Sequence, residues 1–265
     1  MTTLLELGRN GQPLAGVEVI DMHGHLGRYG FAIPDVSVDT VVRGMDRLGV
    51  KQLVTSHMRC MRWTADEIES GNDEVCAAMR RFPGRILGYL TVAPSADAPA
   101  TRRAVERRIG EGFSGVKLHN CNGFPYDHAG YTPVYEVANA HCMPVLFHTW
   151  GDAREFAQVA ALAGRYPDIS FILAHGGCCN PEGYIQAVRQ HPRVFMDTTL
   201  SSSPRGLVER LATEGGADKV VWGSDVYFFS ESQQIGKILG AALSDDIKRK
   251  LLGLNAAAIL GRIRR

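Results

Sequence analysis

The chain is 265 residues long, and its 29 lysine and arginine residues nearly balance its 28 aspartate and glutamate residues. This length suits one large α/β domain or two modest ones. The near-neutral charge argues against nucleic acid and anionic membranes as partners and favours a small neutral or anionic metabolite. Residues 1–16 lack the basic and apolar segments of a secretion signal, and no apolar run is long enough to span a bilayer, so we expect a cytoplasmic protein.

Short runs typical of β-strands alternate along the chain with longer stretches in which apolar residues recur at helical spacing. The predicted strands are Val17–Ile20, Gln52–Thr55, Ile86–Thr91, Gly115–Leu118, Pro144–Phe147, Ser170–Leu173, Val194–Met196 and Val220–Trp222. The predicted helical stretches include Val38–Leu48, Ala153–Leu162, Gly183–Val188 and Leu207–Ala212. Eight strand–helix units in about 250 residues predict a single-domain α/β fold, the (β/α)8 TIM barrel.

No linker, low-complexity tract or change of composition divides the chain. We therefore expect residues 1–16 to form an N-terminal arm and residues 17–265 to form the barrel. The stretch Ser244–Leu260 is expected to be a terminal helix that covers the barrel.

Polar residues that bind metals or carry protons lie at the downstream ends of five of the predicted strands. They are His23, His25, Lys117, His148, His175 and Asp225. In a parallel barrel the carboxyl ends of the strands meet at one mouth, where the active site lies. Two histidines separated by one residue on an extended segment point the same way. Imidazole together with carboxylate suits zinc or another divalent first-row metal, with one position left for water.

Several of these motifs resemble the amidohydrolase superfamily. They are the Asp-x-His-x-His start at residues 21–25, the Gly-Val-Lys-Leu-His segment at residues 115–119, the strand-ending histidines and the Trp-Gly-Ser-Asp segment at residues 222–225. The sequence is most similar to the amidohydrolase-related (amidohydrolase 2) branch, from about Val17 to the C-terminal helices. That branch includes metal-dependent lactonases, other hydrolases and nonoxidative decarboxylases similar to aminocarboxymuconate-semialdehyde decarboxylase.

The resemblance implies one divalent metal per chain, Zn²⁺ or another ion such as Mn²⁺. Its ligands would be His23, His25, His148 and Asp225. His175 would stay off the metal and carry a proton or polarise a carbonyl group. In other branches of the superfamily a carboxylated lysine at the position of Lys117 bridges two metals. The alternative role for Lys117 is a positive charge that pairs with a nearby carboxylate and supports the site. Asp21 is expected to orient a ligand rather than to bind the metal.

Substrate specificity should come from the loops at the barrel mouth. The candidate substrate-binding residues are Arg59, His119, Trp150 and Tyr227. Arginine together with aromatic rings suits a planar carboxylate, and Arg59 is the candidate anchor. The alternative is that these arginines are solvated and that the aromatic rings pack loop against loop.

Two reactions are open to this site. In hydrolysis, the metal makes hydroxide available, Asp225 takes the proton, and His175 assists attack on a lactone, ester or amide. In nonoxidative decarboxylation, the metal holds an aromatic or muconate-type acid, and a proton added beside the carboxylate lets carbon dioxide leave. Because the chain is shorter than many decarboxylases of this branch, hydrolysis is preferred.

Other classes fit the sequence less well. A metal-dependent nuclease similar to the TatD family would have glutamate where Lys117 stands, and a non-catalytic scaffold would have no reason to keep the ligands. The sequence leaves both a monomer and a homodimer open. The six cysteines show no CxxC pair, so reduced thiols are expected, and Cys178 and Cys179 follow the turn after His175.

Overall fold

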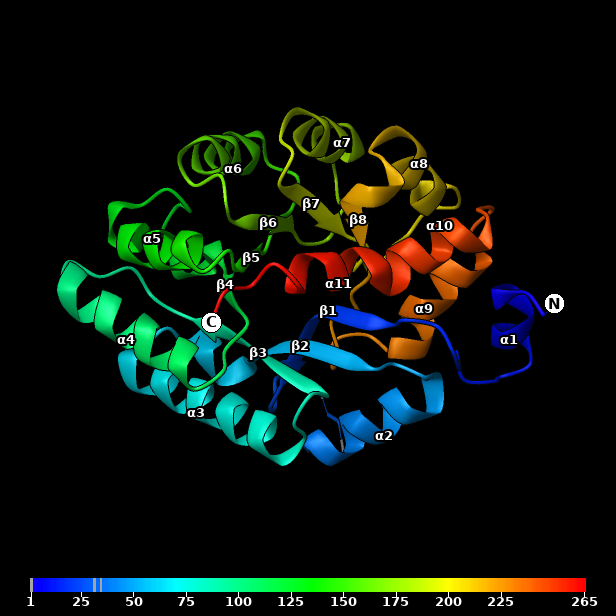
Figure 1. The fold of residues 1–265 in the computed structure, drawn as a ribbon, viewed down its shortest axis with the longest axis horizontal. Coiled ribbons are helices and arrows are strands. Elements are labelled where there is room, and N and C mark those ends of the chain that lie inside the picture. Colours follow the sequence, from blue (N-terminus) through cyan, green and yellow to red (C-terminus); the bar gives the residue numbers. More distant parts are fainter. Residues whose placement is uncertain (1, 31, 34) are drawn as a thin grey trace.

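The computed structural model describes residues 2–30, 32–33 and 35–265. Its centre is a sheet of eight parallel strands in the order in which they occur along the chain (Figure 1). The strands are β1 (Ile20–Leu26), β2 (Gln52–His57), β3 (Ile86–Thr91), β4 (Gly115–Leu118), β5 (Pro144–Phe147), β6 (Ser170–Leu173), β7 (Val194–Asp197) and β8 (Val220–Val221).

Most helices follow a strand and lie outside the sheet, whereas the C-terminal ones cross one end of the barrel (Figure 1). They are α1 (Leu4–Arg9), α2 (Val38–Leu48), α3 (Ala65–Arg81), α4 (Ala98–Gly110), α5 (Thr132–Ala140), α6 (Ala153–Arg165), α7 (Pro181–Gln190), α8 (Leu207–Glu214), α9 (Glu231–Gly240), α10 (Asp245–Arg249) and α11 (Asn255–Leu260). Within the described ranges, none of the helices combines the length and apolarity that crossing a membrane requires.

Backbone hydrogen bonds close the ring between its last and first strands. The Met22 N–H donates to the carbonyl of Trp222 at 3.0 Å, and the Asp225 N–H donates to the carbonyl of His23 at 2.6 Å. A parallel bridge between Gly24 and Val226 extends this contact to the mouth. The expected single-domain (β/α)8 TIM barrel is therefore confirmed.

The first strand is longer and lies later than the sequence pattern indicated. The prediction ended it at Ile20, whereas β1 runs from Ile20 to Leu26, and its pairing with β2 shifts register between Asp21 and Gly24. All seven residues of β1 are buried. The polar side chains of β1 interrupt the apolar pattern from which the strand was predicted, although neighbouring strands and the barrel mouth bury them. His23 and His25 consequently lie within the strand rather than after it.

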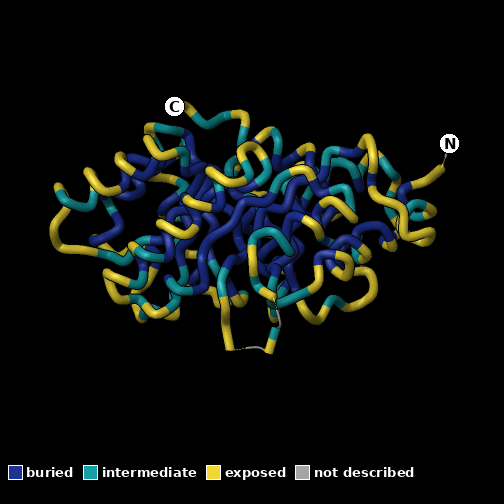
Figure 2. The backbone as a smooth tube through the Cα atoms, turned by 90° about the horizontal axis from the view of Figure 1, so that it is seen from below, coloured by how far each residue is buried: buried dark blue, intermediate teal, exposed yellow. Residues whose placement is uncertain are grey.

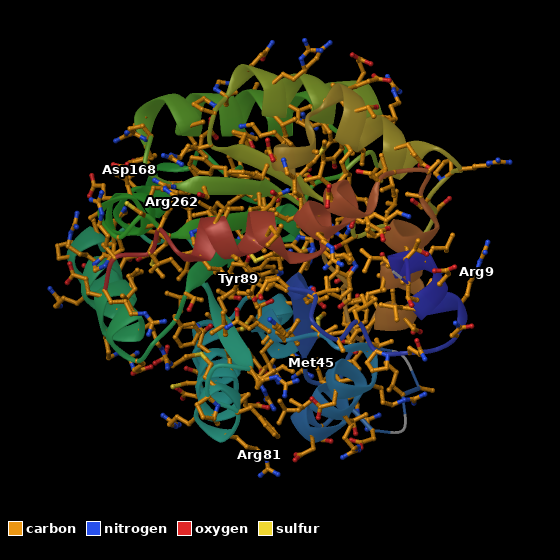
Figure 3. All side chains as sticks on the ribbon, turned by 45° about the vertical axis from the view of Figure 1, so that its right-hand side comes forward. Arg9, Met45, Arg81, Tyr89, Asp168 and Arg262 are labelled. Atoms are coloured by element: carbon orange, nitrogen blue, oxygen red, sulfur yellow. The ribbon has the colours of Figure 1, made fainter. Side chains whose placement is uncertain are left out.

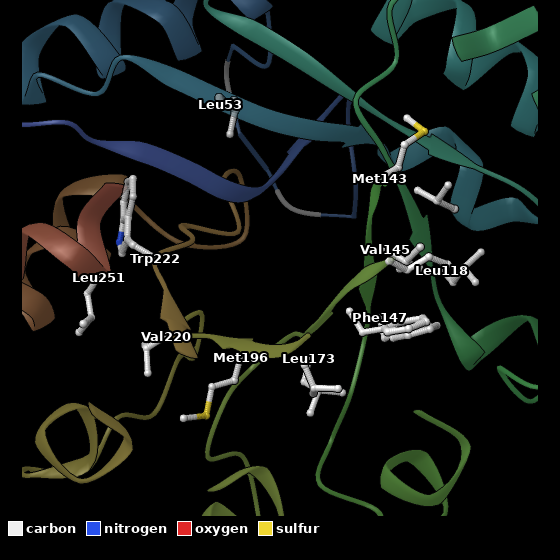
Figure 4. Close-up of a cluster of buried hydrophobic side chains, with 14 of the residues drawn as sticks. Leu53, Leu118, Met143, Val145, Phe147, Leu173, Met196, Val220, Trp222 and Leu251 are labelled. Atoms are coloured by element: carbon white, nitrogen blue, oxygen red, sulfur yellow. The ribbon is translucent and has the colours of Figure 1, made fainter. Parts of the chain in front are cut away.

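Alternating residues of the strands build two cores. Inward-facing residues fill the barrel, and α11 adds Ala256 and Ile259 to that cluster. Outward-facing residues pack against the surrounding helices, as Figure 4 shows for Phe147, Leu173 and Met196. The buried backbone lies in the middle of the molecule, and exposed segments lie at its edges (Figure 2). Burial of both faces explains why these strands read as nearly continuous apolar runs.

The end of the barrel opposite the mouth is covered by the C-terminal helices. Ser244 caps α10, and a π-helical turn over Lys250–Leu254 joins α10 to α11. At Gly253 the turn approaches β1 so closely that a Cβ atom would lie 2.0 Å from the carbonyl oxygen of Glu18. Glycine is the residue that permits this contact.

The N-terminal segment packs against the barrel. Leu4 and Leu14 are buried, and the Leu4 N–H donates to the Asp245 carboxylate at 2.9 Å. Arg9, at the end of α1, projects from the edge of the molecule, whereas Tyr89 lies at the barrel centre (Figure 3). Met1 lies outside the described residues. The arm is therefore a short helix docked near α9 and α10.

A buried carboxyl group lies outside the barrel, on α9. Glu231, in the first turn of α9, is 7% exposed, and its Oε1 has no hydrogen-bond partner among the described residues. Its Oε2 lies against Gly44 of α2, where a Cβ atom would come within 2.7 Å. Burial, followed by the charge of Asp21, raises the pKa of Glu231 from 4.5 to about 8.

Replacement of Gly253 by alanine is predicted to destabilise the fold by about 1–3 kcal/mol, because the added methyl group pushes the π-helical turn away from Glu18. Urea unfolding should show a lower midpoint. The matched control is Gly236→Ala in α9, where nothing lies within 4 Å of an added Cβ atom. That change should leave stability unaltered or raise it by up to about 1 kcal/mol. Equal stability of Gly253→Ala and the wild type would contradict the packing described here.

Replacement of Glu231 by glutamine is predicted to flatten the pH dependence of stability. Since the folded pKa of Glu231 is raised, the folded state holds a proton that the unfolded state has lost between pH 4.5 and about 8. Wild-type stability should therefore fall as pH rises through that window. The variant should be more stable than the wild type above pH 8, by on the order of 2–4 kcal/mol. Urea unfolding from pH 4.5 to 9 measures this, with exposed Glu106→Gln as the control, and parallel curves for Glu231→Gln and the wild type would reject the assignment.

Candidate metal centre

Three buried side chains at the barrel mouth form a group that could hold a metal ion. His23 and His25 come from β1, Asp225 comes from the turn after β8, and one ligand atom of each lies within 4.8 Å of the others. The Asp225 Oδ1 is 3.1 Å from the His25 Nε2 and 3.6 Å from the His23 Nε2. Asp225 has a φ of 57°, in the left-handed region. Such strain is typical of residues held for function.

A second carboxylate fixes the proton of His23. The His23 Nδ1 donates to the Asp197 Oδ2 at 2.8 Å. The His23 Nε2 therefore carries no proton and presents a lone pair. The Asp197 Oδ1 accepts from the backbone N–H groups of His175 at 2.8 Å and Thr199 at 2.9 Å. The sequence prediction missed Asp197 because it ended the seventh strand at Met196. An aspartate that directly follows a buried strand was the available signal.

Asp21 joins the two strands that carry the group. Its Oδ1 accepts from the backbone N–H of His23 at 3.0 Å and of Ser224 at 2.9 Å. Burial raises the pKa of Asp21 to about 7. The His25 Nδ1 meets the Ser56 hydroxyl of β2 at 3.0 Å. Asp21 thus positions the backbone beside the candidate ligands.

Lys117 lies inside the barrel against His23. Its Nζ is fully buried and lies 2.9 Å from the His23 Nε2, so the ammonium donates to the lone pair that Asp197 leaves open. Burial lowers the pKa of Lys117 from 10.5 to about 8, although the charges of Asp225 and Asp197 oppose that change. The direct partner of Lys117 is therefore an imidazole rather than a carboxylate.

His148 and His175 form a second pair at the mouth. The His175 Nδ1 lies 2.7 Å from the Thr199 carbonyl oxygen and must donate to it. In the neutral ring the His175 Nε2 then accepts from the His148 Nδ1 at 3.1 Å. The His148 Nε2 is left as a buried lone pair without a partner. His148 is not a member of the three-residue group, but its orphaned nitrogen is the atom that a metal ion would satisfy.

Burial keeps most of these imidazoles neutral. It lowers the pKa of His23, His25 and His148, and it lowers that of His119 to about 3. Neutral imidazole is the form that binds metals. The donor set of three neutral nitrogens and one carboxylate therefore fits a divalent first-row metal such as zinc or manganese.

Two aromatic rings lie flat against the second histidine pair. His119 stacks on His148 with ring centres 3.7 Å apart, and Trp150 stacks on His175 at 5.3 Å, each with an angle of 12° between the planes. Trp150 is half exposed. The predicted substrate residues His119 and Trp150 thus lie directly beside the candidate centre.

The other two predicted substrate residues have protein partners. The Arg59 guanidinium pairs with Glu74 at 3.0 Å and Glu67 at 3.2 Å. It lines a cavity of about 980 Å³ beside the loops after β1 and β2. The Tyr227 hydroxyl donates to the carbonyl of Ser37 at 2.8 Å. The polar groups of both side chains therefore already bind protein groups in this structure.

Replacement of Asp197 by asparagine is predicted to weaken metal binding about 10- to 100-fold. The amide oxygen can still accept from the backbone of His175 and Thr199, but the amide N–H₂ cannot accept the His23 proton. That proton then moves to the Nε2 and removes the lone pair. Competition titration of Zn²⁺ or Mn²⁺ against a chelating dye measures the effect. Thr198→Val is the control, because its buried hydroxyl has no partner among the described residues, and equal affinities in the two variants would contradict this role for Asp197.

Comparison with known proteins shows what the chain is similar to. No curated protein matches the chain. The 5-carboxyvanillate decarboxylase LigW from Sphingomonas paucimobilis matches with a TM-score of 0.71 and 17% identity, covering 94% of this chain and 100% of that one. A dihydroxybenzoic acid decarboxylase from Polaromonas sp. JS666, with bound manganese and 2-nitroresorcinol, matches with a TM-score of 0.72 and 17% identity over 94% and 98%.

A putative amidohydrolase from Staphylococcus aureus is also similar, with a TM-score of 0.74 and 16% identity over 92% of this chain and 99% of that one. These likenesses show the fold. The model of a metal-dependent enzyme family, described as Amidohydrolase, matches residues 20–262. The chain therefore belongs to this Amidohydrolase family, known as Amidohydro_2.

Proposed function

We propose that the protein is a metal-dependent, nonoxidative decarboxylase of a small planar carboxylic acid. The observation that supports this most directly is the pair of flat rings beside the candidate centre. His119 and Trp150 lie against His148 and His175, and aromatic surfaces of this kind bind conjugated or aromatic substrates. The decarboxylases named above act on carboxyvanillate and dihydroxybenzoic acid, which are planar aromatic acids of this class.

We set aside the preference for hydrolysis, which rested on chain length. The aligned regions cover 100% and 98% of the two decarboxylase chains, so this chain lacks no large part of them. The similar structures also include a 4-oxalomesaconate hydratase from Rhodopseudomonas palustris, at 16% identity and a TM-score of 0.69. Because the fold supports several reactions, the aromatic rings decide our choice of decarboxylation over hydrolysis.

One divalent metal, zinc or manganese, is assigned to His23, His25, His148 and Asp225. Support comes from the lone pairs on the His23 Nε2 and His148 Nε2, and from the three-residue group around the Asp225 Oδ1. When bound, the metal would hold the substrate and withdraw electrons from it. Lys117 places a positive charge beside the proposed metal position, because its ammonium lies against the His23 Nε2.

His175 is assigned the proton transfer. Its Nδ1 donates to the Thr199 carbonyl, so proton transfer falls to the Nε2, which would leave its hydrogen bond with the His148 Nδ1 to take or release a proton. Trp150 covers the ring and limits the access of water to it. A proton delivered to the ring carbon that bears the carboxylate lets carbon dioxide leave, and the electrons of the broken bond restore the conjugated system.

Replacement of His175 by asparagine is predicted to lower kcat for carbon dioxide release about 10²- to 10⁴-fold, because a general acid is lost. The metal content should remain at the wild-type level, since His175 is not assigned as a ligand. Metal analysis of the same samples separates the two roles, and His191→Asn at the end of α7 is the control. Loss of metal together with activity would make His175 a ligand or a structural residue instead.

A substrate scan tests the reaction itself. Purified protein loaded with Zn²⁺ or Mn²⁺ is given hydroxylated benzoic acids and, separately, lactones, while carbon dioxide and acid release are followed independently. We expect carbon dioxide from at least one aromatic acid without ring opening. Acid release from a lactone, with no carbon dioxide from any aromatic acid, would replace decarboxylation by hydrolysis.

A further inference from the structure

Two neighbouring cysteines lie at the mouth of the barrel, outside the candidate metal centre. Cys178 and Cys179 belong to the loop between β6 and α7, and their sulfur atoms are 3.6 Å apart. Cys178 is half-buried against the outer core, whereas Cys179 is exposed. The two thiols therefore present adjacent sulfur atoms, one of which solvent reaches directly.

The loop is held rigidly in this shape. The Cys178 N–H donates to the carbonyl of His175 at 2.9 Å, and the Asn180 N–H donates to the carbonyl of Cys178 at 2.6 Å. A Cβ atom on Gly176 would lie 2.4 Å from the backbone oxygen of Asp197, so the turn fits closely against β7. Cys179 adopts a φ of 55°, in the left-handed region. The sulfur atoms are thus brought together before any ligand arrives.

This spacing disfavours the two commonest uses of paired cysteines. Consecutive Cα atoms are about 3.8 Å apart across a trans peptide bond, less than the roughly 4.4–6.8 Å that ordinary disulfides span. A direct sulfur–sulfur bond would therefore be strained. Structural zinc needs about four ligands, and the described residues place these cysteines in no group of three or more potential ligands. The two cysteines are better suited to bind a single thiophilic atom that bridges their sulfur atoms.

We propose that Cys178 and Cys179 together bind thiophilic electrophiles that can form bonds to two sulfur atoms at once. Trivalent arsenic is the example used here. With an organoarsenic oxide, two arsenic–sulfur bonds form and the arsenic–oxygen bonds break. The oxygen leaves as water with the two thiol protons, and arsenic stays trivalent. Cys179 reacts first because it is exposed, and Cys178 then closes the ring.

The intramolecular second step gives the pair its selectivity. Burial raises the pKa of the Cys178 thiol, so this sulfur alone reacts slowly. Once arsenic is attached to Cys179, the Cys178 sulfur attacks at a high effective concentration. Cys121 is exposed but stands alone, with the Trp63 indole N–H donating to its sulfur, and can form only one bond.

Capture at this site would also disturb the aromatic wall of the mouth. The loop after β5 fits tightly over it, since a Cβ atom on Gly151 would lie 2.3 Å from the backbone oxygen of Cys178. The preceding residue, Trp150, is the ring that stacks on His175. Inhibition on arsenic binding is therefore expected, and this consequence alone rests on the proposed function.

The test treats the 265-residue chain with phenylarsine oxide and follows it by intact-mass spectrometry. We expect one arsenical per chain, which 2,3-dimercaptopropanol removes and 2-mercaptoethanol does not. Cys178→Ser and Cys179→Ser should each weaken binding at least about 100-fold, whereas Cys121→Ser should bind as the wild type does. Circular dichroism confirms that each variant is folded.

No adduct on the wild type, release by 2-mercaptoethanol, or binding by Cys178→Ser or Cys179→Ser as tight as that of the wild type would overturn the proposal. Because stoichiometry is read without any substrate, the outcome is independent of whether the protein is a decarboxylase. Binding without inhibition would keep the capture site and reject only its effect on the mouth.

Discussion

The carboxylate of Asp197 ties three parts of the barrel mouth together. One oxygen accepts the proton of the His23 ring, and the other accepts the backbone N–H groups of His175 and Thr199. Since Thr199 in turn accepts the His175 ring proton through its carbonyl, one buried charge sets the proton positions of both imidazoles. The lone pairs on the Nε2 atoms of His23 and His148 depend directly or indirectly on this arrangement.

The same arrangement explains how so many polar groups remain buried in an apolar barrel. Burial disfavours charge, so the pKa values of the histidines fall, and Lys117 supplies a positive charge near Asp225 and Asp197. Neutral imidazoles paired with oriented acceptors cost less free energy than isolated charges would. A divalent cation at this position would interact with His23 and Asp225 more strongly than the Lys117 ammonium does. The group is therefore suited to metal binding.

Much of the fold and site was predictable because both follow from local patterns. Buried strands appear as apolar runs, and the residue after each run lies at the mouth, so His148, His175 and Asp225 could be placed at the same end of the barrel. The start and length of β1 could not, because its polar residues are covered by distant strands. Asp197 was missed for a similar reason. Its importance comes from His23, 174 residues away.

The ion pairs of Arg59 also could not be predicted from the sequence. Its two partners, Glu67 and Glu74, lie on α3, and only the path of the loop after β2 brings them to the guanidinium. Hydrogen positions on the histidines likewise depend on contacts between β1, β7 and the loop after β7. Sequence patterns therefore identified several of the side chains that meet, whereas the structure shows which of their atoms remain available.

The central claim is that one divalent ion binds to three imidazole nitrogens and one carboxylate at the mouth. The most direct measurement is a crystal structure of the protein grown with Mn²⁺, with anomalous scattering used to locate the ion. Our account predicts a single peak coordinated by the Nε2 atoms of His23, His25 and His148 and by the Asp225 carboxylate. No peak at this position, or two ions bridged by a modified Lys117, would contradict it.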